Sequence, residues 1–288
     1  MEAASLQRLL EHAAMLTPQE LQAQRSELEP VLERFLRELS AGRIRAAFRD
    51  ADGRWHAVAW VKQGILLCFR LGQLREYGDG ELWSFVDVHT LPLRQFRRQE
   101  RVRIVPGGSA VRIGAYVAPG VICMPPMYIN VGAYVDEGTL VDSHALVGSC
   151  AQIGRRVHLS AGVQIGGVLE PPAARPVVVE DEAFIGANSV VVEGVLIRQR
   201  AVIAAGVVLT ATTPVYDLVY ERVLSGTPEA PVEIPEGAVV VPGVRALSSA
   251  YARAHGLGIA TPLIVKYRDA RTDARAALEE ALRQMFNP

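Results

Sequence analysis

The chain has almost no net charge and no long apolar run, and both absences restrict what it can do. Lysines and arginines number 30 against 31 aspartates and glutamates, which leaves a formal net charge of −1 over 288 residues. Nothing therefore favours nucleic acid or an anionic membrane as a partner. No stretch approaches the roughly 18 apolar residues of a membrane-spanning helix. Charged side chains interrupt residues 1–16, which argues against a secretory signal peptide.

Cysteine and histidine are also scarce, at 3 and 6 residues. Cys68, Cys123 and Cys150 are odd in number and widely spaced, so we interpret them as reduced structural thiols of a cytoplasmic protein. Only His144 and His158 fall in the repetitive region of the chain. Catalytic zinc sites use three protein ligands. We therefore expect no metal site.

Apolar residues recur at every sixth position from Val111 to Val215, with one change of phase. A period of six fits neither a helix nor a single long strand. It fits short strands separated by turns, three to each coil of a parallel β-helix. Two series of residues share this period: Val111, Val117, Cys123, Ile129, Val135, Val141, Val147, Ile153, Leu159 and Ile165, and then Val179, Ile185, Val191, Ile197, Ile203, Leu209 and Val215.

In such a coil, residues eighteen positions apart stack at strand spacing, and their inward side chains form continuous columns. The pattern resembles that of the hexapeptide-repeat proteins, whose coils are left-handed. We therefore predict a mainly β fold, a left-handed parallel β-helix with a helical N-terminal domain and a small C-terminal tail domain.

The change of phase falls in a proline-rich segment. Ile165 and Val179 are 14 residues apart, two more than two repeats. We interpret residues 170–178, and above all Glu170–Pro176, as one enlarged turn pushed out of the coil. Because ordinary turns need no such insertion, this loop is a candidate for reaching a ligand or a neighbouring subunit.

Three units are expected along the chain: a mainly helical domain over 1–102, the β-helix over 103–220 and a strand and helix tail over 221–288. Val239 returns to the six-residue period, so the tail is predicted to begin against the last coil. A final helix is predicted from Thr272 to Met285.

The N-terminal domain follows other periodicities. An amphipathic helix is expected around Leu6, and a second from a capping threonine, Thr17, to a stop at Gly42. A hairpin is predicted to turn at Asp52–Gly53, and a further helix to cover 61–72.

Polar residues interrupt the coil most densely in VDEGTLVDSHALVGSC, residues 135–150. Turn positions tolerate aspartate and serine because these side chains bond their own backbone, so each residue alone has a structural explanation. The succession Asp142-Ser143-His144 places an acid, a hydroxyl and an imidazole together. That grouping makes this turn the first candidate for chemistry.

The segment from Met124 to Pro171 closely resembles the tetrahydrodipicolinate N-succinyltransferase family, through the block GAYVDEGTLVD…GSCAQIG…VHLS…IGGVLEP. The likeness continues through RIVPGGSAVRIGAYVAPG before the segment and EDEAFIGANSVVVEGV after it, and more loosely into the N-terminal domain. A related N-acetyltransferase family acts on the same substrate, but lacks the long N-terminal domain and the GSCAQIG block.

The resemblance implies an enzyme that transfers succinyl from succinyl-CoA to the amino group of tetrahydrodipicolinate, in diaminopimelate and lysine biosynthesis. Succinyl-CoA is then a cosubstrate, and no cofactor is permanently bound. The resemblance also implies a homotrimer with an active site in each cleft between neighbouring coils.

Candidate site residues also follow from the resemblance. Arg103 matches an arginine that binds a substrate carboxylate, and Asp142 matches an aspartate at the substrate amine. Where the family carries a second acid, this chain has Val190, and the nearest acid is Glu193. Asp142 then works alone or with Glu193, or the acyl group and the reaction differ in this branch. His144 stands where the family often has tryptophan, and is a candidate substrate contact and an alternative base.

Three other functions share this coil. An N-acetyltransferase would use the same acceptor with acetyl-CoA, and another hexapeptide acyltransferase would act on a different amine or a sugar. A non-catalytic scaffold would bind no CoA, and the non-repeat domains at both ends argue against it. A thiol-release assay with different acyl-CoA donors separates the N-acetyltransferase from a succinyltransferase. The same assay with different acceptors separates the other acyltransferases.

Overall fold

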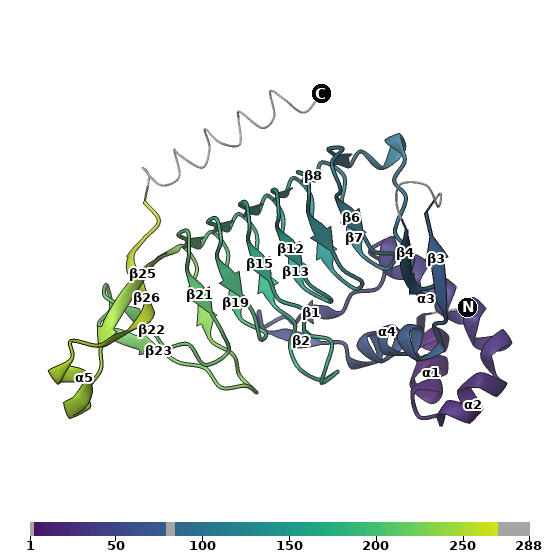
Figure 1. Cartoon of the computed structure of the whole chain (residues 1–288), viewed down its shortest axis with the longest axis horizontal. Helices are drawn as coiled ribbons and strands as arrows, with labels where there is room; N and C mark the ends of the chain where they lie inside the picture. The colour runs from purple at the N-terminus through teal and green to yellow at the C-terminus, as the bar shows by residue number, and fades with distance from the viewer. Residues whose placement is uncertain (1–2, 79–83, 270–288) are drawn as a thin grey trace.

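The computed structural model describes residues 3–78 and 84–269 (Figure 1). Helices gather at one end, a ladder of short strands forms the middle, and a pair of long strands projects at the other end (Figure 1). The predicted final helix, Thr272–Met285, lies outside the described residues.

The helical end contains α1 (Ala3–Ala14), α2 (Pro18–Ala23), α3 (Arg25–Ser40) and α4 (Ala59–Leu71). Their apolar faces meet in one core, which includes Leu6, Leu10, Phe35, Ile65 and Cys68. The predicted helices at Leu6 and over 61–72 are thus confirmed.

The predicted capping of Thr17 is also confirmed. Its hydroxyl accepts a hydrogen bond from the Glu20 N–H, and the Glu20 carboxylate accepts one from the Thr17 N–H. The single helix expected from Thr17 to Gly42 is wrong, because the structure divides it into α2 and α3. Gln24 keeps the helical hydrogen bond to Glu20 O, but its φ and ψ of −97° and 9° leave the helical region.

The predicted hairpin is present as β1 (Ala47–Arg49) paired with β2 (Trp55–Ala57). Asp50 Oδ1 accepts a hydrogen bond from the Arg54 N–H at 2.8 Å, which closes the turn. A second antiparallel pair, β3 (Leu74–Tyr77) and β4 (Phe85–Val88), and the 3-10 helix η1 (Arg98–Glu100) lead to the coil.

The middle is a parallel coil with three faces, each named here after its first strand. The β5 face contains β5 (Arg103–Ile104), β8 (Ile122–Cys123), β11 (Leu140–Val141), β14 (His158–Leu159), β17 (Phe184–Ile185), β20 (Val202–Ile203) and β25 (Ala238–Ala246). The β6 face contains β6 (Ala110–Val111), β9 (Tyr128–Ile129), β12 (Leu146–Val147), β15 (Gln164–Ile165), β18 (Val190–Val191) and β21 (Val208–Leu209). The β7 face contains β7 (Tyr116–Val117), β10 (Tyr134–Val135), β13 (Gln152–Ile153), β16 (Val178–Val179), β19 (Leu196–Ile197) and β24 (Glu233–Ile234).

The six-residue period has a direct physical origin in this coil. The second residue of nearly every strand points inward and is buried, and these residues form one continuous core. Regular neighbours pair eighteen residues apart, as Leu140 does with His158. The turns between strands need left-handed backbone, as at Gly162, where φ is +73° and an added Cβ would lie 2.2 Å from Asn188 Oδ1.

The phase change is a larger insertion than the period suggested. Val179 pairs with Ile153, 26 residues earlier, where the regular coil has eighteen. The loop between β15 and β16 is therefore eight residues longer than an ordinary turn. We had counted an excess of two because that count assumed an intervening repeat, and no strand lies between Ile165 and Val178.

The tail begins against the last coil, as predicted from Val239, which pairs with Val202. Two strands of the faces, β24 and β25, come from residues beyond 220. β25 runs on into an antiparallel ribbon with β26 (Gly258–Tyr267), and β26 also pairs with β22 (Val215–Asp217), next to β23 (Arg222–Leu224). A short helix, α5 (Ala250–Ala254), caps the projecting end of the ribbon (Figure 1).

Candidate active site

The Asp142-Ser143-His144 turn lies at the corner between the β5 face and the β6 face, between β11 and β12. The half-buried Asp142 carboxylate accepts a hydrogen bond from the Ser143 N–H at its Oδ1, at 2.7 Å. Its Oδ2 accepts none from the part of the chain that the structure describes. His144 is exposed, with a left-handed φ of 61°, and its N–H donates to Pro126 O. The corner thus offers one carboxylate oxygen without a hydrogen bond from the described chain and, two residues further on, an exposed imidazole.

Gln164, which we did not select from the sequence, supports this corner. Its side-chain nitrogen donates to His144 O at 3.3 Å and to Gly162 O at 3.1 Å. The Gly162 N–H in turn donates to Ser143 O at 2.8 Å. The sequence offered one indication of this role. Gln164 is polar, whereas most β6-face strands have an apolar residue at their first position.

Arg103 lies on the same face as the strand that precedes Asp142. It opens β5, is exposed, and pairs with Ile122, which pairs with Leu140. Two strand spacings separate Arg103 from Leu140, about 10 Å. Arg103 therefore lies on the face that leads to the Asp142 corner.

Glu193 lies at a different corner, between the β6 and β7 faces after β18. It is exposed with a φ of 57°, and its Oε2 accepts a hydrogen bond from the Ala211 N–H at 3.1 Å. Val190 is the outward residue of β18, between Gln164 and Val208 on the β6 face. Within one chain, the structure therefore does not bring Glu193 and Asp142 together, because they lie at opposite edges of the β6 face.

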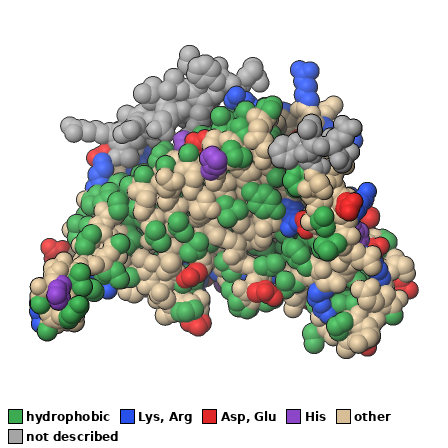
Figure 2. Space-filling view, viewed as in Figure 1, with side chains coloured by type: hydrophobic (Ala, Val, Ile, Leu, Met, Phe, Trp, Pro, Cys, Tyr) green, Lys and Arg blue, Asp and Glu red, His purple; other side chains and the backbone are tan. Residues whose placement is uncertain are grey.

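Two faces of the coil carry apolar outward side chains. On the β5 face the rings of His158 and Phe184 contact each other, with centres 4.7 Å apart and planes inclined by 33°, next to Leu140 and Val202. On the β6 face Val208 is 51% exposed. Hydrophobic side chains are spread along the coil between the helical end and the tail (Figure 2). The β7 face differs, because three of its six outward residues, Gln152, Val178 and Leu196, are buried.

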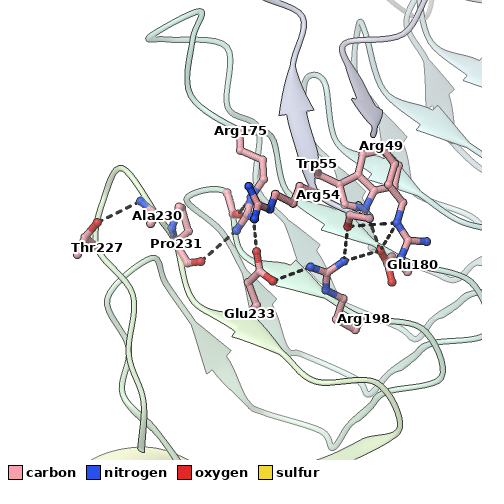
Figure 3. Close-up of polar contacts among 12 residues, drawn as sticks. Arg49, Arg54, Trp55, Arg175, Glu180, Arg198, Thr227, Ala230, Pro231 and Glu233 are labelled. Atoms are coloured by element: carbon pink, nitrogen blue, oxygen red, sulfur yellow. Dashed lines mark hydrogen bonds and ion pairs between the residues drawn. The ribbon is translucent and has the colours of Figure 1, made fainter. Parts of the chain in front are cut away.

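The inserted loop is held near its C-terminal end, at Ala174 and Arg175, by other parts of the same chain. In α4, the buried Lys62 donates through Nζ to Ala174 O at 2.5 Å. Arg175 donates to Gly194 O and to Pro231 O, each at 3.0 Å, and pairs with Glu233 at 2.5 Å (Figure 3). The loop therefore contacts the helical end, the turn that holds Glu193 and the tail. No sequence pattern had indicated Lys62 or Arg175.

The same network joins the N-terminal hairpin to the coil. Trp55 Nε1 donates to Glu180 Oε1 at 2.9 Å, and Arg198 pairs with both Glu180 and Glu233 (Figure 3). Glu180 is only 7% exposed, so these hydrogen bonds satisfy a carboxylate that burial would otherwise penalise.

The three cysteines are buried free thiols. Burial raises the pKa of each thiol, at Cys68, Cys123 and Cys150, to about 12, which agrees with a structural role. Within residues 3–78 and 84–269, no three potential metal-ligating side chains gather, and no helix is long and apolar enough to cross a membrane.

Comparison with known proteins identifies both parts of the chain. Residues 5–71 match the model of the tetrahydrodipicolinate N-succinyltransferase N-terminal region, and residues 176–211 match the model of the hexapeptide repeat of succinyl-transferase. The chain is 45% identical over 260 residues to the 2,3,4,5-tetrahydropyridine-2,6-dicarboxylate N-succinyltransferase of Albidiferax ferrireducens, covering 89% of this chain and 90% of that protein. It is 42% identical over 278 residues to the protein of the same name from Polynucleobacter asymbioticus, covering 95% of each.

A solved structure shares the fold. A putative 2,3,4,5-tetrahydropyridine-2-carboxylate N-succinyltransferase from Campylobacter jejuni superposes with a TM-score of 0.51 at 16% identity, over 81% of this chain and 62% of that one. With the repeat match and the three parallel faces, this confirms the predicted fold class, a left-handed parallel β-helix with a helical N-terminal region.

Proposed function

The chain belongs to the family of 2,3,4,5-tetrahydropyridine-2,6-dicarboxylate N-succinyltransferases, and on that basis we propose how its geometry performs the reaction. The protein is an acyltransferase that uses succinyl-CoA as a cosubstrate and transfers succinyl to the amino group of tetrahydrodipicolinate, in diaminopimelate and lysine biosynthesis. The observation that carries this conclusion is the identity of 45% across 89% of the chain, which includes the helical N-terminal region as well as the repeats.

Asp142 is proposed to accept the proton of the substrate amine. In the hydrated or ring-opened acceptor, the amine nitrogen attacks the thioester carbonyl carbon and the C–S bond breaks. The proton lost from nitrogen passes to the departing sulfur, so CoA leaves as the thiol. The nitrogen loses one proton in this step, and a carboxylate beside it can receive or orient that proton. Asp142 suits this task because its Oδ1 is held by the Ser143 N–H while its Oδ2 remains free within the described chain.

Arg103 is proposed to bind a carboxylate of the acceptor. A guanidinium binds a carboxylate through two parallel hydrogen bonds, which fixes both position and orientation. Arg103 is exposed and opens the face that leads to Asp142, so the acceptor would lie along the β5 face with its amine toward the corner. His144, exposed two residues beyond Asp142, is proposed as a further acceptor contact.

Glu193 is proposed to contribute from a neighbouring chain. Because Glu193 and Asp142 lie at opposite edges of the β6 face, a shared role on one substrate requires two chains. We propose a homotrimer, in which the apolar β5 and β6 faces are covered by neighbours and each cleft between coils holds one active site. We propose three units along the chain: a helical end over residues 1–102, the catalytic coil over 103–220 and the tail over 221–288.

We further propose that the protein works in the cytoplasm without a permanently bound cofactor. Three buried thiols that form no disulfide are typical of a reducing compartment, where acyl-CoA is available.

A thiol-release assay tests the function. Purified protein is given tetrahydrodipicolinate with either succinyl-CoA or acetyl-CoA, and free CoA is measured with a thiol reagent. We expect release that depends on the acceptor and on the succinyl donor. Faster turnover with acetyl-CoA would overturn the succinyl assignment, and equal release without acceptor would show hydrolysis instead of transfer. The buried native cysteines should add little background.

A further inference from the structure

Arginine is concentrated where the chain enters the coil. Residues 94–103 contain five arginines and one acid, Glu100, so this segment has a formal charge of +4. The whole chain has a net charge of −1, which means that the rest of the chain is negative. The segment runs through η1 into β5, at the end of the coil nearest the helices (Figure 1).

Four of these five arginines have no anionic partner. Arg94 is the exception, because it donates to Ala115 O at 3.0 Å and pairs with Glu100, the acid of the segment. The other four are exposed, and no carboxylate within residues 3–78 and 84–269 forms an ion pair with them: Arg97, Arg98, Arg101 and Arg103.

Arginines further along the coil are arranged differently. Each of five pairs with a carboxylate: Arg112 with Asp87, Arg155 with Asp136, Arg156 with Glu182, and both Arg175 and Arg198 with Glu233. Pairing is therefore the usual arrangement of an arginine in this coil. The arginines of the first coil depart from it, and their departure requires an explanation.

The crowding of these charges does not help the fold. Four like charges within seven residues repel one another. The backbone holds them in place, since Arg101 O accepts from the Gly120 N–H at 2.8 Å and the Arg103 N–H donates to Val121 O at 3.0 Å. On the next coil, Glu137 Cγ lies 4.0 Å from the position of a Cβ on Gly120. This exposed acid offsets one charge, and the local balance stays positive.

The unpaired arginines adjoin the proposed acceptor site. Arg101 precedes Arg103 by two residues, so their Cα atoms are at most about 7 Å apart, and Arg97 is at most about 22 Å away. The screening length is about 8 Å at physiological ionic strength and about 30 Å at 0.01 M. The relatives are named for a 2,6-dicarboxylate, and an acceptor with two carboxylates is a dianion that such a surface attracts.

We propose that Arg97, Arg98 and Arg101 form an entry surface that attracts the dianionic acceptor and guides it to Arg103. This inference rests on the proposed function, in which Arg103 binds a carboxylate of the acceptor. The entry surface raises the local concentration of the dianion and its rate of association. It contacts no reacting atom. It therefore lowers the KM for the acceptor and leaves kcat unchanged, because kcat is measured when the acceptor is already bound.

Steady-state kinetics at several ionic strengths test the proposal. The kcat/KM for the acceptor is measured with saturating succinyl-CoA, in potassium chloride from about 0.01 M to about 0.3 M, which spans weak and strong screening. We expect the wild-type value to fall as salt rises. In the triple variant Arg97→Gln, Arg98→Gln, Arg101→Gln it should be about tenfold lower at the lowest salt, the lower end of the range for electrostatic guidance. The two proteins should converge at the highest salt, with equal kcat throughout.

Three exposed arginines elsewhere provide the control. Arg8 lies in α1, Arg54 in the turn of the hairpin and Arg253 in α5. Their joint replacement by glutamine removes the same charge and should keep the salt dependence of the wild type. An equal loss in this control would overturn the proposal, because the effect would then follow the net charge of the chain. Equal salt dependence in the wild type and the triple variant would overturn it too.

The second substrate gives an independent check, because succinyl-CoA is also an anion. Its kcat/KM, measured with saturating acceptor, should have the same salt dependence in the wild type and the triple variant. A loss confined to succinyl-CoA would refute the assignment to the acceptor. Wild-type protein without acceptor-dependent transfer would overturn the proposed function and this inference with it. Transfer with unaltered salt dependence in the triple variant would overturn this inference alone.

A double variant covers the case in which the triple variant fails to fold. Arg97→Gln with Arg98→Gln leaves Arg101, whose φ of 54° is left-handed, in place. We expect part of the loss in kcat/KM at low salt and the melting temperature of the wild type. A folded double variant with the full wild-type salt dependence would contradict the proposal.

Discussion

Replacing Asp142 by asparagine should remove catalysis and leave the fold intact. The structure explains why the fold should tolerate the change. Asp142 is half-buried and follows the inward Val141, and its Oδ1 bonds the next N–H. Asn130 already does the same two turns earlier, where its Oδ1 accepts from the Val131 N–H at 2.8 Å. An asparagine in this type of turn therefore fits without loss of the local hydrogen bond.

The expected loss in Asp142→Asn is about 10²- to 10⁴-fold in kcat/KM, the range for removing a positioned proton acceptor. That corresponds to about 3–5 kcal/mol of transition-state stabilisation. The free energy of unfolding should change by less than about 0.5 kcal/mol, as for a substitution that keeps its contacts. The assay is thiol release with saturating succinyl-CoA, combined with urea unfolding of the same preparations.

A matched control tests whether the effect depends on where the negative charge is removed. Glu137→Gln also removes one negative charge from an exposed turn residue nearby, and should retain near wild-type turnover. Near-normal activity in Asp142→Asn, with activity abolished in His144→Ala, would refute the reasoning and move the base to the imidazole. A large loss of stability in Asp142→Asn would instead give the carboxylate a structural role.

Three further changes test the remaining assignments. Arg103→Lys should raise the KM for the acceptor about tenfold or more while kcat changes little, because the two-pronged contact is lost and the charge is kept. An unchanged KM in steady-state kinetics would exclude Arg103 from the acceptor site. Glu193→Gln should lower kcat and keep the hydrogen bond from the Ala211 N–H. We therefore expect the melting temperature of the wild type with reduced turnover. Unaltered turnover would exclude a catalytic role for Glu193. Lys62→Met should reduce the dependence of the free energy of unfolding on pH. Burial lowers the pKa of Lys62 below 10.5, so between the lowered value and 10.5 the unfolded chain holds more protons and wild-type stability rises with pH. Urea unfolding across that range should show the rise in the wild type and a smaller one in the variant, and identical slopes would contradict it.

The coil could be predicted from the sequence because one rule governs every repeat. Nearly every strand of the coil is two residues long with its second residue buried, so the period of six can be read directly from the sequence. The same rule misjudged the insertion, because a period counts residues and does not reveal whether a strand is present between Ile165 and Val178. The helix from Thr17 was similarly overextended, since the break at Gln24 has no proline or glycine to mark it.

The candidate site was predictable only in part, and distance along the chain explains the difference. Asp142, Ser143 and His144 are consecutive, so their proximity is certain from the sequence. Arg45 and Gln152 are 107 residues apart, and their contact exists only because the hairpin packs on the β7 face. No local pattern encodes that packing. Side-chain contacts between the helical end and the coil therefore had to come from the structure.

The absence of a second acid at position 190 has a structural consequence. Val190 projects outward from the middle of the β6 face, and Gln164 and Val208 are its neighbours. Glu193 is only three residues further on, but it lies past the corner, where its carboxylate is bonded to the Ala211 N–H. It cannot take the place of a side chain at 190 in the same chain, because successive faces of the coil point in different directions. Unless a neighbouring chain supplies Glu193, we expect Asp142 to be the acid that accepts the proton, with His144 of the same corner as the alternative base.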